Sequence, residues 1–593
     1  MTYEMTWDIE TFFAGGSDSK EFSAYLDQIK QGIEHIQHVP PGAQTFESFC
    51  QTIDQFSSLH TSLREAFAFT SCLVAQDMTD EKAKALQGQL VTLNSRATNA
   101  LTVWESSLTT IGQTTWDEWM RSEELGAIAF PLNEIRETRA QKLSDAEETL
   151  INALSMNGYQ GWELLYNTLV QSIRVPFEED GQTTWLSAGQ AANALSSPDT
   201  EVRERLFASW EKAWADKGAF FAETLNNFGG FRLQVYGARG WDSIMKEPLQ
   251  HNRMKEETLD AMWGAITKHK QPFVQYLQRK AELLGKAKMD WQDVNAPLGE
   301  NKKDWNYQAG AEFIRRQFHQ FSEAMGDFAE HALSERWIEA EDRDNKRPGG
   351  FCTTFPESKE SRIFMTYAGT ASNVLTLAHE LGHAFHNYVL RDLPLYQRSY
   401  SMNVAETAST FAEMIVTDAA VNQASSKNEK MALLDDKLQR SVAFFMDIHS
   451  RYLFETRFYE ERKNGSVPYQ RLNELMEEAQ QEAFAGAIGK THPHFWASKL
   501  HFYNTSVPFY NFPYTFGYLF SLSVYARAQK EGKNFEEKYM DLLRDTASMT
   551  VEDLAMKHLQ ADITKEAFWE EGIALCIEDV EEFLELTEGE SAE

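Results

Sequence analysis

The sequence predicts a mainly α-helical protein with one small β-hairpin. Apolar residues recur at three- and four-residue intervals over residues 80–108 and 144–173, and this spacing is typical of amphipathic helices. Residues 349–369 differ, because two short runs rich in Phe, Thr, Ile and Tyr flank a polar turn. Such a pattern indicates a hairpin. No fixed-period repeat is present, so we expect helices packed around a large core.

Two local signals place helices within this pattern. Ser144 and Glu147 have the spacing of a capping box, which predicts a helix start at the beginning of residues 144–173. Ser372 is a suitable N-cap for a helix that begins near Asn373 and continues to about Arg391. The predicted hairpin therefore directly precedes a helix of several turns.

Composition excludes some classes of function. The chain has 593 residues, 42% of them hydrophobic, with 56 Lys and Arg against 89 Asp and Glu, a net charge of −33. This balance argues against nucleic-acid binding, which draws on clustered cations. The four cysteines form no CxxC pair, which is typical of a reducing compartment without a thiolate zinc site. No leader-like N-terminus and no apolar run of about 20 residues is present, so we expect a cytoplasmic protein that does not enter membranes.

A metal-binding motif lies on the helix after the hairpin. Residues 377–389 read LAHELGHAFHNYV, in which His379 and His383 are four residues apart and share one helix face. Their rings can converge on one ion at the Zn–N distance of about 2.0–2.1 Å. Glu380 lies about 100° further round the helix. It therefore borders the ion, where a general base for water belongs. The alternative to a metal site is that His379 and His383 are two hydrogen-bonded histidines of the core.

The third ligand does not come from the same helix. A metzincin site needs Gly and His three and six residues after the second histidine, whereas this chain has His386 and Val389 there. We interpret His386 as a residue of the second shell or facing the substrate, or else as structural. A later helix over residues 400–421 carries Glu406 and Glu413, two turns apart on one face. Small neighbours favour Glu406 as the ligand and leave Glu413 to orient a histidine, but spacing alone leaves both open.

Residues 501–521, HFYNTSVPFYNFPYTFGYLFS, concentrate tyrosine and phenylalanine around one histidine. A metallopeptidase needs a donor for the oxyanion that forms when water attacks the carbonyl. Neutral tyrosine and histidine side chains supply such donors. They also form aromatic walls for an extended peptide. The alternative is an aromatic corner of the core.

These motifs carry a family resemblance. HELGHAFH followed by AETASTFAEM resembles the oligoendopeptidase F family of zinc peptidases, which is related to thimet oligopeptidase. TWDIETFFAGGSDSKEFSAYL is similar to the opening segment of that family, EPLQHNRMKEETLDAMWGAI to its mid-chain helices and GGFC to the strand before its metal helix. The resemblance thus covers most of the chain.

The resemblance implies a residue for each role in the site. It implies one zinc ion per chain held by His379, His383 and Glu406, with Glu380 as base and Glu413 behind the ligands. His501, Tyr510 and Tyr514 follow the order of family residues that stabilise the transition state, although the gap after His501 is longer here. We expect substrate contacts from Gly350, Phe351, Cys352, His386 and Tyr518.

The resemblance also implies an architecture and a reaction. It implies two helical lobes around a deep substrate channel, and we expect an N-terminal helical domain over residues 1–200 and a catalytic domain over residues 201–593. The expected activity is hydrolysis of internal bonds in short peptides by a monomer or small homo-oligomer. One alternative is a peptide-binding protein without turnover, and the intact HExxH argues against it because such a protein has no need of Glu380. The other is a structural zinc protein, which would unfold when the metal is removed by a chelator.

Overall fold

Helices form most of the computed structural model, which describes residues 2–38, 45–179, 181–299 and 305–590. The helices before the first strand are α1 (Lys20–Ile36), α2 (Phe46–Gln76), α3 (Glu81–Leu108), α4 (Gln113–Met120), α5 (Ala129–Ala140), α6 (Asp145–Gly158) and α7 (Gln160–Gln171). The predicted capping box of Ser144 and Glu147 is confirmed at the start of α6. The single run predicted over residues 144–173 is instead two helices, because the backbone turns at Tyr159.

A short antiparallel hairpin of β1 (Val175–Glu179) and β2 (Gln182–Leu186) follows. The helices between this hairpin and the second sheet are α8 (Ala188–Ala194), α9 (Thr200–Ala215), α10 (Gly218–Ala238), α11 (Lys246–His251), α12 (Glu256–Lys268), α13 (Gln271–Leu283), α14 (Tyr307–Phe321) and α15 (Glu323–Ser334). None of the helices in the described ranges has an apolar stretch long enough to cross a bilayer.

The second sheet contains β3 (Ile338–Glu339), β4 (Phe351–Phe355) and β5 (Glu360–Phe364) in the order β3-β5-β4. β4 and β5 are antiparallel, so the predicted hairpin over residues 349–369 is confirmed. β3 pairs in parallel with β5 and was not predicted, because two residues are too few for a sequence pattern. β4 is the outer strand of this sheet. It leaves one edge available for a further strand.

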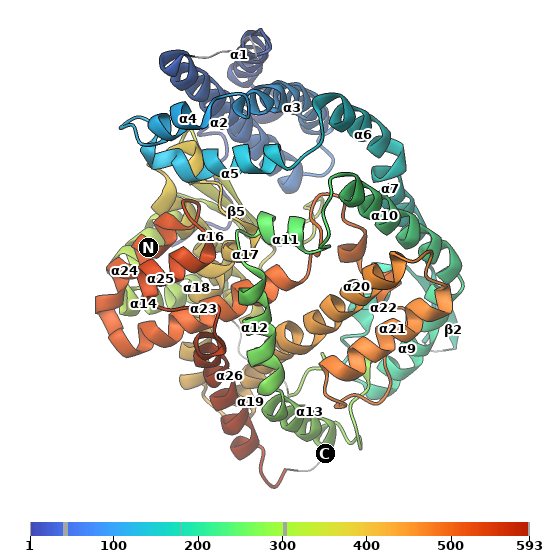
Figure 1. Cartoon of the computed structure of the whole chain (residues 1–593). Coiled ribbons are helices and arrows are strands. Elements are labelled where there is room, and N and C mark those ends of the chain that lie inside the picture. The colour runs from blue at the N-terminus through green and yellow to red at the C-terminus, as the bar shows by residue number, and fades with distance from the viewer. Residues whose placement is uncertain (1, 39–44, 180, 300–304, 591–593) are drawn as a thin grey trace.

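The helices after this sheet carry the metal motif and the aromatic segment. They are α16 (Ala371–Leu390), α17 (Met402–Ala405), α18 (Thr407–Asn422), α19 (Lys427–Val442), α20 (Ile448–Arg462), α21 (Tyr469–Ala483), α22 (Phe495–Ser498), α23 (Phe512–Glu531), α24 (Phe535–Asp545), α25 (Val551–Leu559) and α26 (Glu566–Leu586). Figure 1 shows the N-terminal helices in blue at one end of the molecule, and α6 and α7 lead from them along one side.

Two hydrophobic cores lie on the two sides of the second sheet. One core is built from residues between Trp7 and Leu132 together with Phe355 and Phe364, and the other from Tyr3 and most of the remaining chain, including Ile363. Successive residues of β5 thus face different cores, as the two-residue period of a strand requires. A cavity of about 410 Å³ lies between α5 of the first core and α11 of the second. The domain boundary at residue 200 and the deep channel stay predictions.

Gly382 sets the distance between α16 and α18. A Cβ atom at this position would lie 2.5 Å from the carbonyl oxygen of Ala408 and 2.6 Å from the Cα of Ser409. Both atoms belong to the backbone of α18, so no side-chain rotation relieves the clash. The two helices that carry the predicted ligands are therefore in backbone contact at Gly382.

Gly382→Ala is expected to lower the free energy of unfolding by about 2 kcal/mol or more, because it forces two packed helices apart. Gly88→Ala is the matched control, since a Cβ there meets no atom within 4 Å and the change is expected to stabilise α3 by about 0.5–1 kcal/mol. Urea denaturation midpoints of the two variants measure the difference. Equal midpoints would contradict the packing argument.

Candidate metal centre

The helix that carries the metal motif begins earlier than predicted. Thr370, rather than Ser372, is the N-cap of α16, and its side chain accepts a hydrogen bond from the backbone N–H of Asn373 at 3.2 Å. The Asn373 side chain accepts in return from the backbone N–H of Thr370, which completes a capping box. Ser372 lies in the first turn instead, because this reciprocal pair satisfies two free N–H groups at once.

His379, His383 and Glu406 converge in the structure. One donor atom from each lies within 4.8 Å of the others. A Glu406 carboxylate oxygen is 3.3 Å from His379 Nε2 and 3.6 Å from His383 Nε2. Ligands at 2.0–2.1 Å in a tetrahedron are about 3.3–3.4 Å apart, so Glu406 lies at about the distance from each histidine that two ligands of one zinc-sized ion require.

Further contacts orient these three side chains. His379 Nδ1 lies 3.2 Å from a Glu413 oxygen, which leaves Nε2 directed toward Glu406. The other Glu413 oxygen forms an ion pair with Arg440 of α19. The backbone of Ala405 is hydrogen-bonded to the His383 ring, and Ser409 donates to Glu406 at 2.8 Å. Arg440 and Ser409 were not found by sequence reasoning, since neither belongs to a spaced motif.

The protonation states of His383 and Glu406 suit a cation. Burial lowers the pKa of His383 to about 4, with a further contribution from His379, so its ring is neutral at pH 7. Burial alone would raise the pKa of Glu406, but the hydrogen bond with His379 and the electrostatic interaction with His383 bring it to about 2. Neutral imidazoles and an ionised carboxylate are the forms that bind metals.

Glu380 borders this cluster. Its side chain is 8% exposed, and its Oε2 has no hydrogen-bond partner within the described part of the chain. Burial raises the pKa of Glu380 to about 7, and the nearby negative Glu406 adds to this effect. A carboxyl with a pKa near neutrality, free at one oxygen, can both accept and return a proton.

Glu406 is held by a break between two helices. The run predicted as one helix over residues 400–421 is interrupted at Glu406, which joins α17 to α18. Ser521 of α23 donates to the carbonyl oxygens of Glu406 and Thr407 at 3.3 and 3.1 Å. A Cβ at Gly517 of α23 would lie 3.1 Å from the Cβ of Glu406. Helix α23 therefore packs directly against the break and helps to fix the position of Glu406.

The prediction that His386 faces the substrate is wrong. His386 is fully buried, and its Nε2 lies 3.2 Å from the Leu543 carbonyl oxygen and 3.0 Å from the Thr546 hydroxyl. Its ring stacks on Tyr400 with centroids 4.3 Å apart. The side chain is held in the packing between α16 and the end of α24, so the structural alternative holds.

The aromatic segment brings three predicted residues together. The His501 ring centroid is 5.2 Å from that of Tyr510 and 6.3 Å from that of Tyr514, and Tyr514 lines the same cavity as His379 and Glu406. Burial lowers the pKa of His501 to about 4, so its imidazole is neutral at pH 7. Tyr518 contributes its ring to the cavity, but its hydroxyl lies 3.1 Å from that of buried Ser441.

The predicted substrate strand lies beside the base. A Cβ at Gly350 would be 3.6 Å from a Glu380 oxygen, so the start of β4 adjoins the cluster. Phe351 stacks on Phe364 across the hairpin with centroids 5.2 Å apart. Cys352 is hydrogen-bonded to Ser361 and Asn387. The side chains of Phe351 and Cys352 are thus engaged in contacts within the protein.

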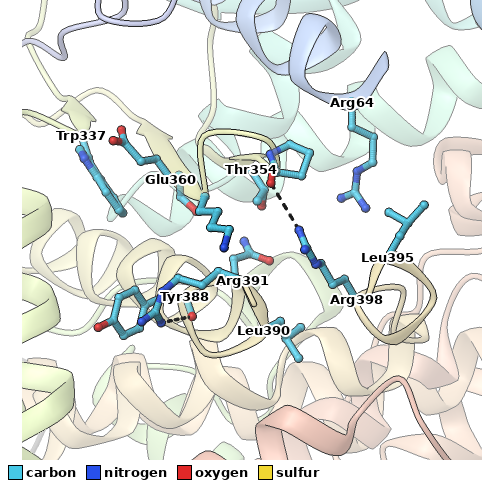
Figure 2. Close-up of a pocket in the computed structure, with 13 residues that line it drawn as sticks. Arg64, Trp337, Thr354, Glu360, Tyr388, Leu390, Arg391, Leu395 and Arg398 are labelled. Atoms are coloured by element: carbon cyan, nitrogen blue, oxygen red, sulfur yellow. Dashed lines mark hydrogen bonds between the residues drawn. The ribbon is translucent and has the colours of Figure 1, made fainter. Parts of the chain in front are cut away.

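Within the described residues, one cavity beside α16 is separate from the metal cluster, and another is connected with it. That cavity, of about 460 Å³, is lined by residues of α16, α18, α19 and α23. Figure 2 shows the other, of about 30 Å³, where Arg64, Arg391 and Arg398 gather near the C-terminal end of α16. Arg398 donates there to the Pro356 carbonyl at 3.4 Å. None of the predicted site residues lines this second cavity.

Known proteins are similar to this chain in both sequence and fold. The family model described as peptidase family M3 matches residues 193–575, and a model described as oligopeptidase F matches residues 108–174. An oligoendopeptidase F homolog of Lactococcus lactis is 23% identical over 92% of each chain. The oligopeptidase PepF of Bacillus subtilis is 22% identical over 98% of this chain and 87% of its own.

Solved structures of other proteins have a similar fold. A putative peptidase from Chlamydophila abortus has a TM-score of 0.85 at 19% identity over 99% of both chains. The oligoendopeptidase-F from Enterococcus faecium has a TM-score of 0.71 at 18% identity and covers 97% of this chain and 100% of its own. These proteins share the mainly helical fold of this chain.

The chain is a peptidase. More specifically, it belongs to peptidase family M3, a family of metallopeptidases, and its relatives are named oligoendopeptidase F. The resemblance seen in HELGHAFH and AETASTFAEM is thereby confirmed.

Proposed function

We propose that the protein is a zinc-dependent endopeptidase that hydrolyses internal bonds of short peptides. The convergence of His379, His383 and Glu406 beside Glu380 carries this proposal. Two imidazoles and one carboxylate are the ligand set of hydrolytic zinc sites that keep a position open for water. The names of the relatives, oligoendopeptidase and oligopeptidase, support short peptides as substrates.

The metal and Glu380 have separate tasks. Zinc bound by the three ligands would polarise the scissile carbonyl and lower the pKa of a water molecule. Glu380 accepts the proton that the attacking water loses and passes it to the amine nitrogen as the peptide bond breaks. Its free Oε2 and its pKa near 7 suit both steps. The outer strand β4 offers backbone groups to hold the peptide extended beside Glu380.

Tyr514 is the proposed donor to the oxyanion, supported by Tyr510 and His501. It lines the cavity with His379 and Glu406, and its hydroxyl is hydrogen-bonded to Tyr510. Burial raises the pKa of Tyr514 well above its usual range, so the phenol keeps its proton and can donate it in a hydrogen bond. A neutral donor stabilises developing negative charge without adding a fixed charge to the site.

Tyr514→Phe is expected to lower kcat/KM by about 10²-fold, because it removes one oxyanion donor and keeps the ring. Tyr518→Phe is the matched control. Its hydroxyl bonds to Ser441 inside the core, and the ring that lines the cavity is retained, so kcat/KM should change little. Steady-state kinetics with one peptide measure both variants. A larger loss for Tyr518→Phe would assign the donor to that residue instead.

Mass mapping of cuts in a mixed peptide library, combined with metal analysis of the same sample, tests the proposed function. We expect one zinc per chain and cuts at internal bonds. Cuts confined to chain ends would contradict the endopeptidase assignment. Tight peptide binding without any cut would favour a binding protein, and unfolding on chelation would favour a structural zinc site.

A further inference from the structure

The cavity beside the metal cluster has walls of two kinds. His379 and Glu406 lie on one side of it, and its apolar wall consists of Leu375, Met414, Phe444 and Leu522. Helix α19 contributes three charged residues, Asp436, Lys437 and Arg440. At about 460 Å³ the cavity has room for a long amino-acid side chain. The charged groups of α19 therefore decide which side chain suits it.

The two cations of this wall are already paired. Lys437 Nζ lies 2.6 Å from Asp418 and 2.7 Å from Asp579. Arg440 is paired with Glu413, whose other oxygen faces His379. Arg440 thus helps to hold Glu413 beside His379, and Lys437 links α19 to α26 through Asp579. Neither cation leaves an unbalanced positive charge in the cavity.

Asp436, unlike Lys437 and Arg440, has no ion-pair partner among the described residues. No hydrogen bond or ion pair joins its carboxylate to another side chain within the ranges that the structure describes. The adjacent Asp435 is buried. It forms an ion pair with Lys280 at 3.0 Å and accepts a hydrogen bond from the Tyr276 hydroxyl at 2.6 Å. The Asp436 side chain is exposed and lines the cavity. A carboxylate that lines the cavity without an ion-pair partner of its own is available to a positively charged ligand.

We propose that this cavity receives the side chain of a residue next to the scissile bond, and that Asp436 selects lysine or arginine there. The inference rests on the proposed endopeptidase function and adds its substrate class. The methylene stem of a basic residue can lie along Leu375, Met414 and Phe444 while the charged head reaches Asp436. An uncharged side chain of equal length gains only the apolar wall. A glutamate meets the uncompensated charge of Asp436.

Three internally quenched peptides test this inference, identical except for lysine, norleucine or glutamate in turn at each position flanking the cut. For the wild-type protein we expect kcat/KM about tenfold higher for lysine than for norleucine at one of these positions, with glutamate cleaved most slowly. Asp436→Asn should remove most of the lysine advantage and leave norleucine unchanged. Asp436→Glu should restore it. The norleucine peptide shows in each variant that the protein is folded and active.

Glu578→Gln is the matched control, because it removes one negative charge from a neighbouring cavity that no metal-cluster residue lines. It should keep the lysine advantage. An unchanged lysine-to-norleucine ratio in Asp436→Asn would overturn the inference, and so would a preference for glutamate, which would assign the cavity to Arg440. Equal cleavage of all peptides would contradict only this inference. No cleavage of any peptide would contradict the proposed function as well.

Discussion

Replacing Glu380 by glutamine is expected to lower kcat/KM for peptide cleavage by at least about 10³-fold, because the amide cannot take a proton from water. The metal ligands are untouched, so the zinc content should stay at that of the wild type. Steady-state kinetics and metal analysis on one preparation measure both quantities. The effect should fall on kcat rather than on KM, since Glu380 acts on the water and the leaving amine.

The stability of this variant provides a second readout. The Glu380 carboxyl is buried, and its raised pKa shows that its charged form is disfavoured there. Its neutral isostere should therefore leave the melting temperature equal to or above that of the wild type. Loss of activity with a large drop in melting temperature would point to a structural role. Cleavage that persists in a stable Glu380→Gln variant would refute the proposed proton transfer.

Glu406→Gln and Glu413→Gln are expected to differ in metal affinity. Loss of a ligand carboxylate at Glu406 should reduce zinc affinity by more than about 10²-fold, whereas loss of the residue that orients His379 typically costs 10–100-fold. The two variants make the same chemical change, one at the break between α17 and α18 and the other within α18. Competition with a chromogenic chelator measures both dissociation constants. The reverse order would make Glu413 the third ligand and overturn the assignment of Glu406.

The metal helix could be predicted from the sequence because its information is local. The four-residue spacing of His379 and His383 fixes a shared face, and the apolar pattern around them fixes which other face is buried. The N-cap was misplaced by two residues because Thr370 and Ser372 are chemically similar. The reciprocal bonds of Thr370 with Asn373 decide between them in three dimensions.

The third ligand could not be fixed in the same way. On one continuous helix Glu406 and Glu413 would share a face, so spacing leaves them nearly equivalent. The backbone break at Glu406 separates their roles, and it is supported by Ser521 and Gly517 from a helix more than a hundred residues later. For His386, contacts with residues distant in sequence overturned the prediction. Its sequence position suggested the active site, but contacts with Leu543 and Thr546, distant in sequence, hold it in the core.

Cleavage of a peptide blocked at both ends tests the central claim most directly. Such a substrate has neither a free amine nor a free carboxylate, so only an internal cut can destroy it. We expect cleavage by the metal-loaded protein, no cleavage after removal of the metal by a chelator while the melt still shows a folded chain, and recovery when one equivalent of zinc is returned. Undiminished cleavage by the metal-free protein would contradict the account.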